Sequence, residues 1–252
     1  MSKRDSQILE ILTAEHRVEV SSLAERLGVS NVTMRKDLDA LQDRGIVARE
    51  HGYALLADAT DTSGRLAYHY DEKVYIARRA AELVSDGSTV MIENGSCCTI
   101  LAKELAAAKK DITIVTNSSF IAEYLRNDPT ATVILLGGVV QRNSQVTVGP
   151  MVPMCAREFM VDYLFVGADG WRDDAGFTND DQMRAEAVRG MAPQASNVFV
   201  LTESAKFARH GLVPLRLDDH LTGVITDEGI PADARKFLEE RGKQIICVER
   251  VD

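Results

Sequence analysis

Seven short runs rich in apolar and β-branched residues recur between residues 89 and 248, and longer segments of helical character separate them. The runs cover residues 89–93, 112–116, 132–136, 163–167, 197–202, 223–226 and 244–248. Several are apolar at consecutive positions, which is typical of strands that helices cover on both faces. The pattern therefore predicts a layered α/β domain with a largely parallel sheet.

A polar segment, ADATDTSG, occupies residues 57–64 and contains almost nothing that a core could bury. It is typical of a linker. We therefore expect a small domain over residues 1–57, a linker over 58–68 and a larger domain over 69–252. A length of 252 residues is compatible with this division.

The composition is that of a soluble globular protein, with 45% hydrophobic and 27% charged residues. It excludes collagen-like, coiled-coil and disordered chains. The longest near-apolar stretch, residues 133–140, is far shorter than the ~20 residues of a membrane span. The four cysteines are too few and too scattered for a disulfide scaffold. We expect a cytoplasmic protein with free thiols and no membrane segment.

The net charge of −9 argues against a general nucleic-acid binder, because such proteins usually carry a basic surface. The charge is unevenly distributed, however. Residues 1–56 carry eight Lys and Arg against nine Asp and Glu, whereas the rest of the chain carries 21 against 29. If any part of the chain binds DNA, it is the N-terminal part.

The N-terminal part has the pattern of three short helices followed by a two-stranded wing. Ser21 is placed to cap the second helix, and Ser30 is placed to cap a third that runs to about Arg44. Residues 46–49 and 53–56 predict the wing. Two helices joined by a tight turn can place the second one in the major groove of DNA.

The third helix would expose the residues that could read DNA. Met34, Leu38 and Leu41 recur at helical spacing and predict its buried stripe, which turns Arg35 and Lys36 outward. An arginine can reach a guanine edge or a phosphate, a lysine a phosphate, and a valine a thymine methyl group. The predicted DNA contacts are Ser30, Asn31, Val32, Thr33, Arg35, Lys36, Arg49 and His51.

A winged helix that only dimerises, with an ordinary solvated face, is the alternative interpretation. A resemblance favours DNA binding over it. Arg4, Ile8 and Leu12 at four-residue spacing, followed by the segment SNVTMRKDL at residues 30–38, resemble the helix-turn-helix signature of the DeoR family of bacterial transcriptional regulators. The resemblance implies a winged helix that binds double-stranded operator DNA.

The resemblance continues beyond the linker and covers nearly the full chain. It rests on Arg65, Glu72-Lys73, Ile76-Ala77, Asp86-Gly87, Thr116-Asn117, Gly137-Gly138, Asp162, Phe165, Gly167, Asp169-Gly170 and Lys206-Phe207. It implies a sensor domain that resembles ribose-5-phosphate isomerase in fold and binds a phosphorylated sugar or sugar alcohol. Gly176-Phe177-Thr178 and Ile225-Thr226-Asp227 are similar to the hexitol (glucitol) operon repressors of the family.

The residues themselves also indicate a phosphate site. Residues 89–93 predict a strand, residues 94–97 a polar loop with a glycine, and Thr99 onward a helix. Free N–H groups and the helix dipole then meet at one place. The loop of residues 116–119 follows the next strand in the same way, and both loops lie at carboxyl ends of strands, where ligands of open α/β sheets bind. The alternative is a pair of ordinary capped turns.

The predicted ligand-binding residues are Asn94, Gly95, Ser96, Cys97, Thr116, Asn117, Ser118, Asp169, Gly170, Thr178 and Lys206. Cys97 stands where the family more often has Ser or Thr, and it is either a reactive thiol at a helix N-terminus or a small packed residue. Asp169 could instead cap a turn, and Lys206 could be solvated. Glu93, Arg184 and Val188 also depart from the family pattern. The five histidines show no metal-ligand spacing, so we expect no metal and no cofactor.

Together these features predict a transcriptional regulator and not an enzyme: a repressor of a carbohydrate-utilisation operon that a phosphorylated sugar or polyol releases from its operator. Recognition of paired half-sites implies a homo-oligomer, either a dimer or a tetramer. An activator would use the same residues and differ only in its consequence. The rival from another class is a sugar-phosphate isomerase-like enzyme with a DNA-binding appendage. Glu93, Asp169 and Glu186 are its candidate general bases, but the sequence does not arrange them as a catalytic set.

Overall fold

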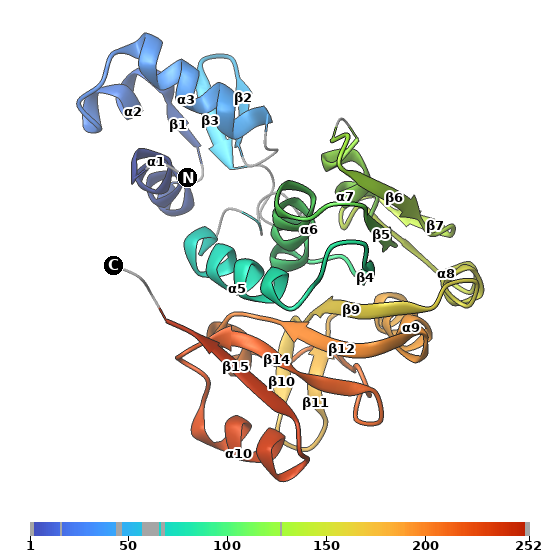
Figure 1. Cartoon of the computed structure of the whole chain (residues 1–252). Helices are drawn as coiled ribbons and strands as arrows, with labels where there is room; N and C mark the ends of the chain where they lie inside the picture. The colour runs from blue at the N-terminus through green and yellow to red at the C-terminus, as the bar shows by residue number, and fades with distance from the viewer. Residues whose placement is uncertain are drawn as a thin grey trace. The chain divides into compact units, whose positions relative to one another are not determined.

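The structure is a computed structural model that describes residues 3–15, 17–43, 47–56, 66, 69–126 and 128–249. The chain forms two compact units, Met1–Asp71 and Glu72–Asp252 (Figure 1). The predicted linker, residues 58–68, lies outside the described residues except for Leu66.

The N-terminal unit is a winged helix. Its elements are α1 (Lys3–Glu15), β1 (Arg17–Glu19), α2 (Val20–Arg26), α3 (Asn31–Asp43), β2 (Val47–Glu50) and β3 (Tyr53–Leu56). The antiparallel sheet has the order β1-β3-β2. The three helices and the β2–β3 wing agree with the sequence prediction. Strand β1 was not predicted, because three residues are too few to show a period.

The caps and turns of this unit agree only in part with expectation. Ser30 does cap α3, because its Oγ accepts the N–H of Thr33 at 3.1 Å. The predicted cap Ser21 was wrong: α2 begins at Val20, whose N–H donates to the carbonyl of Gly52 in the wing at 3.0 Å. That long-range bond fixes the start of the helix. His51 and Gly52 both have positive φ, 48° and 88°, as a tight hairpin turn requires.

The second unit is built on a seven-stranded, all-parallel sheet with the order β15-β14-β12-β9-β4-β5-β6. The strands are β4 (Thr89–Ile92), β5 (Ile112–Thr116), β6 (Ala131–Leu135), β9 (Val161–Gly167), β12 (Ala195–Leu201), β14 (Leu221–Asp227) and β15 (Gln244–Val248). All seven predicted strands are confirmed to within two residues, and so is the α/β fold class.

Helices surround the sheet, and two small antiparallel sheets flank it. The helices are α5 (Tyr70–Glu82), α6 (Ser96–Ala108), α7 (Ser119–Tyr124), α8 (Met151–Ala156), α9 (Gln182–Met191) and α10 (Ala232–Glu240), with the short turns η1 (Ala192–Gln194) and η2 (Ser204–Ala208). The small sheets are the hairpin β7 (Val139–Gln141)–β8 (Val146–Val148) and the ribbon β10 (Gly170–Arg172), β11 (Gly176–Asn179) and β13 (Val213–Pro214).

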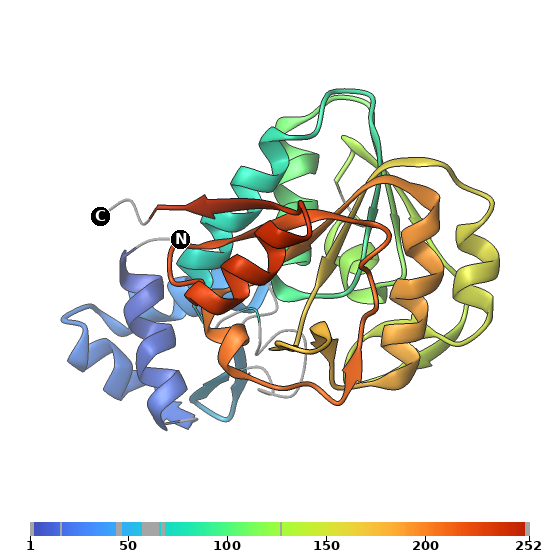
Figure 2. The ribbon, with the colours of Figure 1, turned by 90° about the horizontal axis from the view of Figure 1, so that it is seen from below.

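Both faces of the large sheet are buried. On one face, Met91, Leu164 and Val166 share a core cluster with Val152 of α8 and Val188 of α9. Helices α5 and α6 lie on the other side of the central strands (Figure 2). Because neighbouring strand residues point to opposite faces, two-sided burial requires apolar runs and not alternation. This is why the strands were visible as continuous apolar segments in the sequence.

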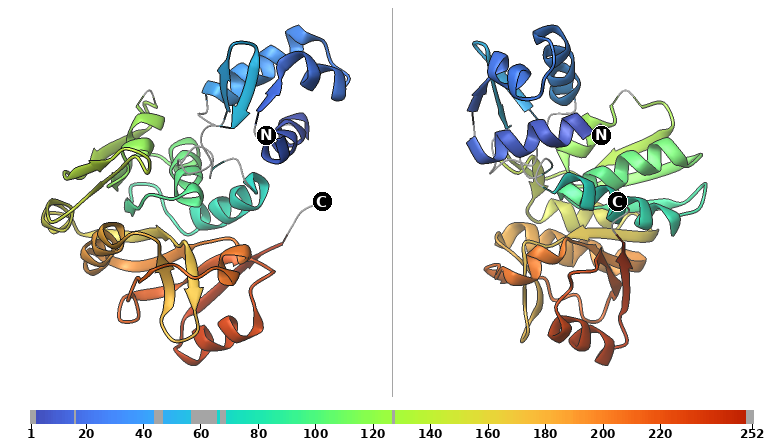
Figure 3. Two further views of the ribbon diagram at one scale, coloured as in Figure 1. Left: turned by 180° about the vertical axis from the view of Figure 1, so that it is seen from behind. Right: turned by 90° about the vertical axis from the view of Figure 1, so that its left-hand side faces the viewer.

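The strand order has a reversal point at the middle of the sheet. From β4 the chain builds outward through β5 and β6 on one side, and through β9, β12, β14 and β15 on the other (Figure 3). Loops at the carboxyl ends of β4 and β9 therefore leave in opposite directions. Ligands of open α/β sheets bind at such a reversal point.

Candidate DNA-binding surface and sensor site

Helix α3 buries one face and exposes the other, as its period predicted. Met34, Leu38 and Leu41 are fully buried, whereas Arg35 and Lys36 are exposed. Val32 is 78% exposed. An apolar side chain this exposed beside two cations fits a helix that lies in a major groove, where a thymine methyl group could cover it.

A surface hollow brings the helix and the wing together. Its lining residues are Glu19, Val20, Ser21, Asn31, Arg35, Gln42, Arg49, His51 and Gly52. Four predicted DNA contacts, Asn31, Arg35, Arg49 and His51, thus share one concave surface. The other four, Ser30, Val32, Thr33 and Lys36, lie on the first turns of α3 outside this lining.

Ion pairs hold this surface in shape. Arg49 of the wing donates to Oε1 of Gln42 at 2.9 Å and pairs with Asp39, so its guanidinium is tied to α3. Arg4 of α1 donates to both carboxylate oxygens of Asp37 at 2.6 and 3.3 Å. The Asp37 partner raises the pKa of Arg4. Arg4, a residue of the family signature, therefore orients the recognition helix.

In the second unit, the loop after β4 ends at a helix N-terminus at the reversal point of the sheet. Gly95 precedes α6 with extended backbone, and Thr99 donates both its N–H and its hydroxyl to the carbonyl of Gly95, at 2.8 and 2.9 Å. The predicted start of this helix, Thr99, was wrong by three residues, so Ser96 and Cys97 lie in the first turn and not in a loop. The N–H groups of Ser96, Cys97 and Cys98 have no acceptor within the helix.

The loop after β5 is held by its own hydrogen bonds. Thr116 donates its hydroxyl to the carbonyl of Ile92 at 2.6 Å, and Asn117 donates its amide to the carbonyl of Thr147 at 3.2 Å. Ser118 donates to Oδ1 of Asn94 at 3.1 Å and caps α7. These three predicted ligand residues thus have structural partners, which favours the interpretation of this loop as a capped turn that supports the first loop.

Asn94 has one side of its amide unused. The residue is 4% exposed, and its Nδ2 has no hydrogen-bond partner among the residues that the structure describes. A buried amide donor without an acceptor costs free energy. A ligand oxygen at this position would remove that cost.

Charged groups from several elements surround the N-terminus of α6. Lys73 of α5 is 2% exposed, and its Nζ lies 3.7 Å from Oε1 of Glu203. Glu93 is buried and accepts the N–H of Gly167 at 3.2 Å. Asp227 accepts the N–H groups of Ser204 and Gly229 at 2.7 and 2.9 Å. Burial acts to raise the pKa of Asp227, but these hydrogen bonds outweigh it and lower the pKa.

Lys73 is a candidate site residue that the sequence prediction missed. It stands in line with Ile76, Ala77 and Ala80, which are all fully buried on α5. The sequence does contain a signal for it: Lys73 occupies a position of the apolar stripe that this helix buries. Lysine is almost never fully buried unless it is paired, so a lysine in such a stripe indicates a partner or a ligand.

Cys97 is placed as a packed residue and not as a reactive thiol. It is 4% exposed. Burial, and next the negative charge of Glu203, raise the pKa of the Cys97 thiol to about 12, although Lys73 and Lys206 oppose this. Burial also raises the pKa of Cys98. Both side chains therefore stay protonated at neutral pH, and a protonated thiol is a poor nucleophile.

The remaining predicted ligand residues lie after β9 and on the β10–β11 ribbon. Thr178 accepts the N–H of Gly211 at 2.9 Å, and a Cβ on Gly170 would come within 2.4 Å of the carbonyl of Arg209. Both residues thus hold the segment around residue 210. Asp169 accepts the N–H of Asp180 at 3.1 Å and pairs with Arg184. Lys206 is half-buried on η2.

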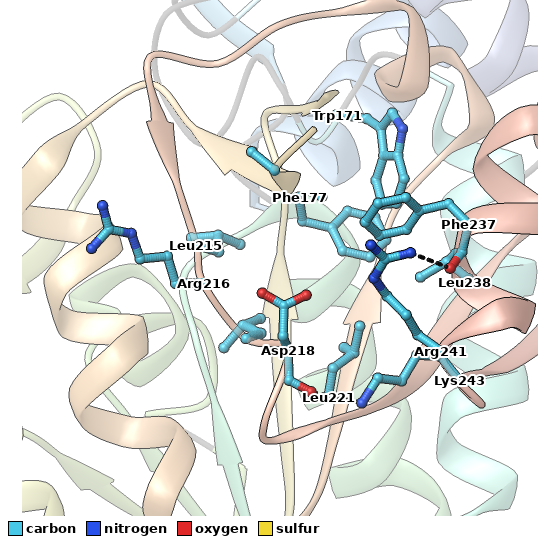
Figure 4. Close-up of a pocket in the computed structure, with 13 residues that line it drawn as sticks. Trp171, Phe177, Leu215, Arg216, Asp218, Leu221, Phe237, Leu238, Arg241 and Lys243 are labelled. Atoms are coloured by element: carbon cyan, nitrogen blue, oxygen red, sulfur yellow. Dashed lines mark hydrogen bonds between the residues drawn. The ribbon is translucent and has the colours of Figure 1, made fainter. Parts of the chain in front are cut away.

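A separate slot lies between the β10–β11 ribbon and α10, and it contains no predicted site residue (Figure 4). Trp171, Phe177 and Phe237 form its aromatic wall. Arg241 stacks over the ring of Phe237 at 3.4 Å, and Lys243 donates to the carbonyl of Asp218 at 2.7 Å. Trp171 itself is 3% exposed.

No cluster of three or more His, Cys, Asp or Glu in the described part of the chain could hold a metal ion. No helix over those same ranges is long and apolar enough to cross a membrane.

Comparison with known proteins agrees with this architecture. Residues 4–60 match the DeoR-like helix-turn-helix domain, and residues 68–228 match the DeoR C terminal sensor domain. A protein of Escherichia coli O157:H7 named as an aga operon transcriptional repressor is 30% identical, and the match covers 98% of this chain and 94% of that protein. The glycerol-3-phosphate regulon repressor of Escherichia coli K12 is 26% identical, and the match covers 97% of this chain and 98% of that protein.

A solved structure of ribose 5-phosphate isomerase A from Methanocaldococcus jannaschii has a TM-score of 0.41 and 17% identity, over 55% of this chain and 54% of that chain.

The family matches cover both units of the chain, and the relatives match along nearly their whole length. The protein is therefore a member of the DeoR family of transcriptional regulators.

Proposed function

We propose that this protein represses a carbohydrate-utilisation operon and that a phosphorylated sugar or polyol releases it from its operator. Two features of the same chain carry the proposal. The N-terminal unit exposes a helix with basic side chains, and the sheet of the second unit has, at its reversal point, hydrogen-bond donors without a partner among the described residues. Those donors are the first N–H groups of α6 and Nδ2 of Asn94. The names of the relatives, repressors of the aga operon and of the glycerol-3-phosphate regulon, support a sugar-related role.

The sensor site suits a phosphate by its chemistry. Backbone N–H groups at a helix N-terminus and the helix dipole favour an anion. Lys73 and Lys206 act electrostatically on Cys97 in the first turn of α6, so both cations lie in range of an anion bound there. We propose that Gly95, Ser96 and Cys97 bind the phosphate group of the ligand, and that its sugar part extends toward Asp169.

The repressor is proposed to act as a homo-oligomer. One short recognition helix reads only a few base pairs, and paired half-sites supply the rest. Apolar side chains exposed on β7, α8 and α9 support self-association: Val139 (64%), Val140 (55%), Met151 (54%), Met154 (63%) and Met183 (40%). These elements are neighbours around β8, and a contiguous apolar patch on a protein surface marks an interaction site. Val140→Glu together with Met154→Glu should lower the mass measured by light scattering.

The isomerase alternative has less support. The carboxylate of Glu93 is buried and accepts a backbone N–H, Asp169 pairs with Arg184, and Glu186 is exposed and accepts a hydrogen bond from Gln182. A general base must be available to the proton it removes, and each of these three carboxylates is already engaged by a group of the protein. We therefore propose that the protein binds sugar phosphates without converting them.

The test combines DNA binding and ligand binding on the full chain. A footprint on DNA upstream of the neighbouring carbohydrate genes should show a protected site with two related half-sites. A thermal-shift panel of phosphorylated sugars and polyols should raise the unfolding midpoint, because a ligand that prefers the folded state stabilises it. The same compound should weaken the footprint. Ligand binding without any change in the footprint would refute the proposed switch.

A further inference from the structure

Arg184 is a buried cation whose side chain has too few partners. The residue is 8% exposed and lies in the first turn of α9. Its Nη2 lies 3.4 Å from Oδ2 of Asp169, which is long for a charged pair. Its Nε is buried and has no hydrogen-bond partner among the described residues.

A guanidinium carries five N–H donors, and burial without acceptors is costly. The position of Arg184 is nevertheless fixed. Asp181 caps α9 by accepting the N–H of Arg184 at 2.9 Å, and its other carboxylate oxygen accepts a bond from Gln141 at 3.0 Å. Asp181 thus ties the N-terminal end of α9, and with it the backbone of Arg184, to Gln141. An acceptor from outside the protein is the simplest means of satisfying Nε.

The Asp169–Arg184 pair follows the strand whose end touches the Gly95 loop. Asp169 comes two residues after Gly167, the last residue of β9. A Cβ on Gly95 would lie only 3.5 Å from Cα of Gly167, so the two loops touch at the reversal point of the sheet. A sugar phosphate held at the start of α6 could therefore extend from the Gly95 loop toward this pair.

We propose that Asp169 and Arg184 bind the end of the effector opposite its phosphate, and that this end is neutral and hydroxylated. The pair offers a carboxylate acceptor and guanidinium donors side by side, and a hydroxyl group can serve both because it donates and accepts. A carboxylate on the ligand would gain from Arg184 but would face Asp169, a like charge. The inference rests on the proposed function and narrows it to phosphorylated polyols and sugars, excluding phosphorylated sugar acids.

Two matched pairs of compounds test this by calorimetry on the wild-type chain: glucitol 6-phosphate against 6-phosphogluconate, and glycerol 3-phosphate against 3-phosphoglycerate. In each pair only the end opposite the phosphate changes, from a hydroxyl to a carboxylate. We expect the neutral member of the better-bound pair to bind at least tenfold more tightly. Equal or tighter binding of the acid would overturn the inference.

Variants identify the residue responsible. Arg184→Gln should weaken binding of the neutral compound at least tenfold but leave the affinity for inorganic phosphate within twofold of wild type. Arg184→Lys keeps the positive charge beside Asp169 but has no Nε, and we expect a similar loss. Arg157→Gln, an exposed change on the neighbouring α8 end, is the control. A loss of phosphate affinity equal to the loss of polyol affinity would show that Arg184 acts through structure, and would overturn the assignment.

The failure of the inference can be told from that of the proposed function. If inorganic phosphate and all four compounds fail to bind the wild-type chain, the phosphate site itself is wrong and both proposals fall. A second outcome refutes only the polyol subsite. In it, the phosphate compounds bind, but the neutral and acidic members of each pair bind equally and the Arg184 variants do not lower the affinity for the neutral compound.

Discussion

Ser118 donates its hydroxyl proton to Oδ1 of Asn94 across 3.1 Å, and its own hydroxyl oxygen accepts the N–H of Ile121 at 3.2 Å. One hydroxyl thus caps α7 and orients the amide of Asn94 on the neighbouring loop. Because Oδ1 is engaged, the amide can offer only its Nδ2 donors to a ligand. The loop after β5 therefore acts on the sensor site through the loop after β4.

Ser118→Ala should therefore have two effects. Loss of an N-cap costs about 1 kcal/mol of folding free energy, which urea unfolding would detect. Loss of the bond to Asn94 should also weaken effector binding severalfold, because the amide can then rotate. Ser119→Ala removes a neighbouring hydroxyl for which no hydrogen bond is seen in the described part of the chain, and it should change neither quantity. A variant with lower stability but wild-type effector affinity would show that Asn94 does not contact the ligand.

In DNA binding, we expect Arg35 to contribute to sequence-specific affinity and Lys36 to sequence-independent affinity. Arg35 lines the hollow between helix and wing, so Arg35→Ala should weaken operator binding by about 1–3 kcal/mol and relax preference at one base position. Lys36→Ala should weaken operator and random DNA alike and flatten the salt dependence by about one unit, as loss of a phosphate contact would. Gel-shift titrations at several salt concentrations measure both. Wild-type binding by each variant would contradict the recognition-helix assignment.

The features that the sequence predicted are those that local periodicity determines. The strands of the large sheet were visible because both faces are buried, and α3 was visible because Met34, Leu38 and Leu41 repeat at helical spacing. Short elements such as β1 and β13 were not predicted, because two or three residues have no period and pair only through partners distant in the chain. The false cap at Ser21 has the same cause: the bond from Val20 to the wing decides where α2 begins.

The candidate site was predictable only in outline. Polar loops after two strands predicted a site at one edge of the sheet, since parallel strands bring their carboxyl ends together. The sequence could not reveal which polar atoms already have partners in the fold. Thr116 and Asn117 are engaged by the backbone of Ile92 and Thr147, whereas Lys73 and Arg184 become buried only when distant elements pack.

The Lys73–Glu203 pair predicts a strong effect on stability. Lys73→Met leaves Glu203 buried without its cation, and loss of one partner of a buried pair costs about 3–5 kcal/mol. The double variant Lys73→Met with Glu203→Leu removes both charges and should recover most of that loss in urea unfolding. Neither variant should keep wild-type affinity for a sugar phosphate. Full affinity in a folded double variant would mean that Lys73 has no part in phosphate binding.

The protonated state of the cysteines can be checked by alkylation. With the pKa of Cys97 raised to about 12, the thiol remains protonated from neutral pH up to about pH 11, and burial blocks access as well. Iodoacetamide at pH 8 should therefore leave the peptide with Cys97 and Cys98 unmodified, as read by mass spectrometry. The same peptide should react fully after unfolding in urea. Rapid labelling of Cys97 in the folded protein would revive the reactive-thiol interpretation.

The proposed switch is tested most directly at Gly95. Gly95 has extended backbone that any residue can adopt, and a Cβ there would find its nearest neighbours at 3.5–3.8 Å, which is ordinary contact. Gly95→Ala should therefore fold and respond to effector, and it is the matched control. Gly95→Asp adds a carboxylate where the phosphate is expected. Repulsion of like charges in a poorly solvated place should weaken effector binding more than tenfold, or ~1.4 kcal/mol.

Operator binding by Gly95→Asp should survive, because the helix-turn-helix lies in the other compact unit of the chain. In cells this variant would repress without responding to inducer. Operator affinity measured with and without effector, for the wild type, Gly95→Ala and Gly95→Asp, separates the possibilities. If Gly95→Asp still releases DNA fully, the phosphate binds elsewhere. Oδ1 of Asn117 and Nε of Arg184, which have no hydrogen-bond partner among the described residues, then become the next positions to examine.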